Sequence, residues 1–140
     1  MGLEIADDDL PYQAETRSIR VAVRPSYRPD QSAPDEDHFV WAYRIRIENR
    51  GPETVQLRTR HWVITDGNGR VQEVRGPGVV GEEPVLRPGQ SFEYVSGVPL
   101  STPTGLMQGS YGMHTDEGEH FEVEVPPFSL DSPQQVARPN

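Results

Sequence analysis

Short apolar segments separated by proline and glycine limit what this chain can fold into more than any other feature. In the clearest segment, Phe39, Trp41, Tyr43, Ile45 and Ile47 alternate with more polar residues, as in a half-buried strand. Proline and glycine, 14 and 13 of 140 residues, are spread between such segments. No long window has a helical period. The sequence therefore predicts an all-β protein, an immunoglobulin- or fibronectin type III-like β-sandwich of about seven to eight antiparallel strands.

The length suits a single domain, which we expect to cover residues 15–133. Residues 1–14 are polar and acidic and are predicted to be a disordered tail, as are residues 134–140. Turn chemistry at residues 49–52 predicts a hairpin between its two flanking strands. In the second of these strands, Val55 and Leu57 are out of phase with Trp62 and Ile64, which predicts a β-bulge at residues 59–61.

Composition excludes several function classes. The chain has no cysteine, which rules out disulfides and thiolate metal sites. A net charge of −9 argues against nucleic acid and anionic membranes as partners. No apolar run approaches the roughly 18 residues of a membrane span. The acidic N-terminus does not resemble a signal peptide. We therefore expect a cytoplasmic protein, monomeric or homodimeric, without a cofactor.

A glycine-rich stretch near the middle matches the G-x-G-x-x-G spacing of dinucleotide-binding loops, with Gly76-Pro77-Gly78-Val79-Val80-Gly81. A phosphate loop needs a following helix, and Glu82, Glu83 and Pro84 do not continue as one. The interpretation that the sequence favours is a crossover between two sheets, in which Val79 and Val80 either anchor the loop to the core or form an exposed apolar tip.

Two clusters of charged residues are candidate ligand sites. His114, Asp116, Glu119 and His120 fall in one predicted hairpin, and imidazole and carboxylate groups suit divalent cations. The alternative is a solvated acidic turn.

The second cluster lies in the basic middle of the chain, whose residues 38–75 carry a net charge of +3. If two strands pair in the expected register, Arg44, Arg46, Arg58 and Arg60 form a basic patch for an acidic partner or a phosphate. An outer face neutralised by neighbouring glutamates is the favoured alternative.

No motif places a nucleophile, base and orienting group together, so the sequence argues against an enzyme. Tyr111 is either a tyrosine corner of the sandwich or an ordinary core aromatic.

Several segments together resemble the ApaG family: Phe39-Val-Trp-Ala-Tyr-Arg-Ile-Arg-Ile-Glu-Asn49, Arg60-His-Trp-Val-Ile-Thr-Asp66, Gly76-Pro-Gly-Val-Val-Gly81 with Pro84, Pro88-Gly-Gln-Ser-Phe-Glu-Tyr94, Gly109-Ser-Tyr111 and Pro127-Phe-Ser-Leu-Asp131. The resemblance covers about residues 15–133. It implies a fibronectin type III-like sandwich and a binding module, with a genetic association with cobalt and magnesium efflux or resistance. It implies no catalytic residues.

From these observations we expect a non-enzymatic binding module that contacts an unidentified protein partner, with residues 76–81 as the contact loop. Any role in cobalt or magnesium resistance would be indirect. The alternative is a small-ligand protein that binds a divalent metal or a nucleotide polyphosphate.

Overall fold

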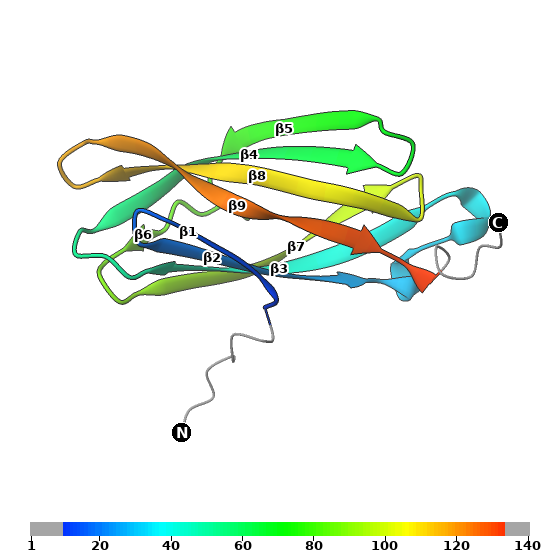
Figure 1. Ribbon diagram of the computed structural model, residues 1–140, viewed down its shortest axis with the longest axis horizontal. Coiled ribbons are helices and arrows are strands. Elements are labelled where there is room, and N and C mark those ends of the chain that lie inside the picture. The colour runs from blue at the N-terminus through cyan, green and yellow to red at the C-terminus, as the bar shows by residue number, and fades with distance from the viewer. Residues whose placement is uncertain (1–9, 134–140) are drawn as a thin grey trace, which may run out of the picture.

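The computed structural model describes residues 10–133 as two antiparallel sheets packed face to face. In the view of Figure 1, the sheet that contains β5, β4, β8 and β9 lies above the sheet that contains β1, β2, β3 and β7. The predicted all-β sandwich is confirmed. The described part of the chain contains nine strands. Two of them, Tyr12–Thr16 and Val85–Leu86, are short and were not predicted from the sequence pattern.

The strands of the first sheet run in the order β1-β2-β3-β7. Their bounds are β1 Tyr12–Thr16, β2 Ile19–Tyr27, β3 Phe39–Asn49 and β7 Ser91–Leu100. The second sheet has the order β5-β4-β8-β9, and β6 pairs with the start of β4. Its strands are β4 Val55–Asp66, β5 Val71–Pro77, β6 Val85–Leu86, β8 Thr104–Thr115 and β9 His120–Asp131. Two single-turn 3-10 helices, Pro29–Gln31 and Pro34–Glu36, link β2 to β3. No helix within residues 10–133 is long and apolar enough to cross a membrane.

The core lies between the sheets and follows the predicted alternation. On β3, the five apolar residues at odd positions from Phe39 to Ile47 are all buried, and the residues between them are not. Aromatic and β-branched side chains favour such a pleated, half-buried surface, so the strand forms where the sequence places it. Trp62, Tyr111 and Phe128 from the second sheet complete the core, with their rings in edge-on contact.

The predicted disordered tail at residues 1–14 is wrong at its end. Leu10 is fully buried, and β1 begins at Tyr12 and pairs with β2. A tight turn joins these two strands, with positive φ angles at Arg17 and Ser18. The pattern was missed because the strand is short and its polar residues face solvent. Residues 1–9 and the predicted tail at 134–140 lie outside the described residues.

The predicted hairpin at residues 49–52 is also wrong. β3 pairs with β2 and β7, whereas β4 pairs with β5, β6 and β8, so this turn carries the chain from one sheet to the other. Buried Asn49 supports the crossing by donating from its side-chain amide to the carbonyls of Glu53 and Leu86, at 2.7 and 2.9 Å. Turn residues alone do not say whether the next strand pairs with the last one or crosses the core.

The predicted β-bulge in β4 exists, but it lies between Leu57 and Thr59, slightly earlier than expected. The shift matters because it sets the direction of every later side chain in the strand. After the bulge, Arg60 has the same phase as Trp62 and Ile64, and it pairs with buried Tyr111 of β8.

The two long sides of the sandwich differ. On one side, β9 packs against β1 and β2, and the rings of Tyr12 and Phe128 lie 6.1 Å apart. We call this the closed side. On the other side, the edge strands are β5 of one sheet and β7 of the other, and a cavity lies between them. We call this the open side.

Candidate functional site

The cavity on the open side has a volume of about 410 Å³, within the usual range of small-ligand pockets. β4 and β5 provide one wall, and β3 and β7 provide the other. Its lining is mainly aromatic and aliphatic: Tyr43, Trp62, Ile64, Val74, Val79, Val80, Tyr94, Val98, Pro99 and Met107. The polar side chains on it are Arg60, Gln72 and Ser96, and no carboxylate lines it.

Arg60 is the charged group of the cavity. Its Nη1 donates to the carbonyl oxygens of Pro77 and Gly78, at 2.8 and 3.0 Å. Its guanidinium also lies against Gly76, where an added Cβ would be only 3.0 Å from Nη2. Among residues 10–133, no carboxylate oxygen lies within 4.0 Å of Arg60. The arginine therefore fastens the glycine loop to β4 and keeps its charge without an acidic partner.

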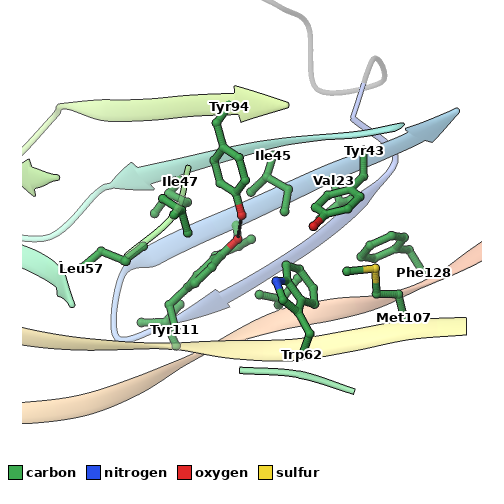
Figure 2. Close-up of a cluster of buried hydrophobic side chains, with 14 of the residues drawn as sticks. Val23, Tyr43, Ile45, Ile47, Leu57, Trp62, Tyr94, Met107, Tyr111 and Phe128 are labelled. Carbon is green, nitrogen blue, oxygen red and sulfur yellow. Dashed lines mark hydrogen bonds between the residues drawn. The ribbon is translucent and has the colours of Figure 1, made fainter. Parts of the chain in front are cut away.

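A pair of tyrosines lies beside the cavity. The hydroxyl groups of Tyr94 on β7 and Tyr111 on β8 are 2.6 Å apart and buried, and Figure 2 shows them meeting between the two sheets. Burial raises the pKa of both hydroxyls, and the proximity of the two groups raises that of Tyr111 further. Both therefore stay protonated. The partner of Tyr111 is another side chain rather than the backbone, so Tyr111 is a core aromatic and not a tyrosine corner.

The glycine loop, residues 76–81, forms one rim of the cavity through Val79, Val80 and Gly81. No helix follows it. Val79 and Glu82 instead bond to each other through both backbone groups, at 2.8 Å each, and close a two-residue turn. Gly78 is required there, because its φ is +61° and an added Cβ would lie 2.4 Å from the carbonyl oxygen of Glu82. A phosphate loop is therefore the wrong interpretation of the glycine spacing. The predicted crossover between two sheets is also wrong, because β5 before the loop and β6 after it both pair with β4 in the same sheet.

The two valines of this loop have separate roles. Val79 is 1% exposed and joins the core, whereas Val80 is 54% exposed at the tip. Val80 also has a φ of +43°, in the left-handed region that a β-branched residue strongly disfavours. Turns of this type prefer Asn or Gly at that position. The chain thus holds a strained, exposed apolar side chain at the rim of its cavity.

The predicted basic patch is not assembled. Arg44 and Arg46 lie on β3 in one sheet, and Arg58 and Arg60 lie on β4 in the other. Arg58 bonds to Glu83 at 2.7 Å, while Arg60 turns inward to the cavity. The prediction required that β3 and β4 form a hairpin, and they do not.

The predicted metal cluster is brought together only in part. The rings of His114 and His120 are 5.3 Å apart across the β8–β9 hairpin, but Glu119 bonds to Arg17 at 2.8 Å. Asp116 is exposed in the turn between the two strands. No three His, Asp or Glu side chains of the described chain are placed to hold a metal ion.

Arg58 adds a further obstacle to a cation at this hairpin. It donates to His114 Nε2 at 3.2 Å, which occupies one of the two ring nitrogens that could bind a metal and brings a positive charge beside it. The hairpin therefore does not favour a cation site.

Sequence reasoning placed Arg60 on the outer face and did not foresee the cavity. One signal could have revealed the arginine, because Arg60, Trp62 and Ile64 are spaced by two and must share a face unless a bulge separates them. Placing the bulge at residues 59–61 instead of at 57–59 removed that inference. The cavity itself needs the distance between the two sheets, which no local pattern contains.

The fold and this cavity define the class: a small β-sandwich domain with one closed side, and one open side built around a mainly apolar cavity that contains a single arginine. The family model of the ApaG domain matches residues 29–115. The chain belongs to the ApaG family.

Individual relatives agree with that assignment. Protein ApaG of Rhodospirillum centenum is 69% identical over 129 residues, which cover 92% of this chain and 99% of the relative. Protein ApaG of Parvibaculum lavamentivorans is 64% identical, over 87% of this chain and 94% of its own length. The crystal structure of a Bordetella pertussis protein described as ApaA has a TM-score of 0.81 and 48% identity, and covers 86% of this chain and 98% of that one.

Proposed function

We propose that this protein is a binding module without catalytic activity, and that it captures a partner protein with the open side of its sandwich. The observation that carries the proposal is Val80, which is strained and 54% exposed at the rim of the cavity. Backbone strain that nothing nearby compensates is concentrated at functional sites.

Val80 is the β-branched residue among the four non-glycine residues with positive φ in the described chain, since the others are Arg17, Ser18 and Asp37. Arg17 forms an ion pair with Glu119 at 2.8 Å, and its guanidinium stacks 4.4 Å above the ring of Phe121. Asp37, with a φ of +55°, is of a residue type that tolerates the left-handed region. Val80 has neither compensation. An apolar contact with another molecule would use this side chain.

The position of the edge strands also favours the open side as the binding surface. β5 and β7 each end a sheet, so each has backbone groups free to accept an extended segment. Any role in cobalt or magnesium resistance would then act through the partner, because the His114–His120 hairpin does not favour a cation. The single arginine of the cavity also could not balance the several charges of a nucleotide polyphosphate.

The test compares two valines of equal exposure. Val80 and Val85 are both 54% exposed, but Val85 lies on β6 and does not line the cavity. Proteins that crosslink to the wild-type chain in lysate are identified, purified and titrated against wild type, Val80→Asp and Val85→Asp. We expect Val80→Asp to weaken binding about tenfold or more and Val85→Asp to change it less than about twofold.

The substitution at residue 80 is suited to this purpose because aspartate tolerates a positive φ, so the fold is retained. Val79 is unsuitable, since it is 1% exposed and a charge there would disrupt the core. A purified partner that binds Val80→Asp as tightly as wild type would overturn the proposal.

A further inference from the structure

The charge of the cavity differs from that of the whole protein. Among the side chains that line it, the only charge is the guanidinium of Arg60, although the whole protein has a net charge of −9. A half-buried cation without a carboxylate nearby is costly, because desolvation is not repaid by an opposite charge. The cavity is therefore complementary to an anion.

The free edge of Arg60 indicates which anion. Nη1 is occupied by the carbonyls of Pro77 and Gly78, while Nε and Nη2 have no hydrogen-bond partner in the described part of the chain. These two nitrogens form one edge of the planar guanidinium, which matches the two oxygens of a carboxylate. A single arginine also balances the single charge of a carboxylate.

Trp62 supplies a further unused donor. The residue is 4% exposed, yet its indole N–H donates to no group among residues 10–133. Since Tyr27 Oη is the only fully inaccessible side-chain polar atom without a partner in that range, the indole nitrogen remains accessible to solvent. Trp62 lines the cavity, so its N–H is available to an acceptor on a bound group.

The remaining wall is apolar. Val79, Val98 and Met107 are all buried residues that line the cavity, and its volume of about 410 Å³ suits one large apolar side chain together with an acidic group. The ligand must therefore join a carboxylate to an apolar body.

We infer that the cavity is a subsite for a carboxylate that the partner protein carries beside a large apolar side chain, with Arg60 binding the carboxylate. This inference rests on the proposed function and names the chemistry of its partner. Residues 76–81 serve the subsite by holding Arg60 in place through the carbonyls of Pro77 and Gly78.

A direct test uses a small probe and the two tryptophans. The wild-type protein is titrated with 3-phenylpropionate and, as a neutral control, 3-phenylpropionamide, and the indole N–H signals are followed by NMR. Trp41 is an internal reference, because it is 1% exposed and donates to the carbonyl of Asp131 at 2.8 Å, away from the cavity. We expect a saturable shift of the Trp62 signal with the acid, no shift of Trp41, and about tenfold or more weaker binding of the amide.

Two variants test whether binding of the acid depends on the charge of the cavity rather than on a change in folding. Arg60→Gln should weaken binding of the acid about tenfold and leave binding of the amide unchanged. Gln72→Glu changes an exposed residue of the cavity wall without changing its size, and its negative charge should weaken the acid severalfold. Equal binding of acid and amide, or binding of the acid unaffected in both variants, would overturn the inference.

The outcomes also distinguish this inference from the proposed function. If Val80→Asp loses the partner but the acid does not bind, the inference fails and the proposed function stands. If the acid binds through Arg60 but does not displace the purified partner, the cavity is not a subsite for that partner and the inference is overturned. Displacement of the partner by the acid, and not by the amide, supports both.

Discussion

The closed and open sides of this sandwich are built from similar strands but differ in what covers the core between the sheets. On the closed side, Phe128 of β9 is fully buried and packs against the rings of Tyr12, Tyr43 and Trp62. On the open side, the corresponding space is a cavity of about 410 Å³ with an unpaired arginine and a strained valine at its rim. The comparison indicates that the closed side provides stability, and the open side is where we propose that the partner binds.

The largest expected effect comes from emptying the closed side. Phe128→Ala removes a fully buried ring and should lower the free energy of unfolding by about 3–5 kcal/mol, measured by urea denaturation. Val80→Ala on the open side should change it by less than about 1 kcal/mol, because that side chain is largely exposed. Equal losses would contradict the division between the two sides.

Alkaline pH should break the tyrosine pair next to the cavity. The native pKa values of Tyr94 and Tyr111 lie above the ordinary value of 10.0, so the folded protein keeps protons that the unfolded chain releases. The unfolded state then binds fewer protons, and stability falls as the pH rises above about 10. Each tyrosine should contribute a loss of about 1.4 kcal/mol per pH unit.

Unfolding by urea between pH 8 and pH 11 measures this slope. The double variant Tyr94→Phe with Tyr111→Phe should remove the contribution of both groups and flatten the curve. An unchanged slope in the double variant would show that other groups cause the loss.

Removing one hydroxyl of the tyrosine pair at neutral pH tests whether the two hydroxyls stabilise each other. Tyr94→Phe leaves the hydroxyl of fully buried Tyr111 without its partner and should cost about 1–3 kcal/mol. The double phenylalanine variant should cost less than the sum of the single variants, since no unpaired hydroxyl remains. A double-mutant cycle measures the difference, and strict additivity would contradict the coupling of the two groups.

The smallest expected effect is a gain in the free energy of unfolding rather than a loss. Val80→Asn places a residue suited to positive φ before Gly81 and should stabilise the protein by about 1 kcal/mol. Val85→Asn, at equal exposure in a strand, should not. Urea denaturation measures the gain, and titration of the partner should show weaker binding by the stabilised variant. A gain in stability with full binding would mean that the strain at Val80 serves no contact.

Prediction from the sequence succeeded for strands with a clear alternation and failed for strands too short to show one. Alternating residues predicted β3 and the two phases of β4, because period two is a property of each strand alone. The continuation of β9 to Phe128 passes two prolines at 126 and 127, which sit where its pairing with β8 shifts register. β1 was missed because it is short, and β6 because a two-residue strand has no period.

The sequence by itself determined the sandwich, its core aromatics and the family, since these depend on local periodicity and on motifs read along the chain. It did not determine the path of residues 76–81, which the sequence predicted to cross between the sheets although β5 and β6 on either side both pair with β4. Only the tertiary structure decided that the chain crosses between sheets after Asn49, that Arg60 points inward, and that β5 and β7 remain apart around a cavity. These features depend on which strands pair and where one bulge lies, and the energies that select them come from contacts between residues distant in sequence.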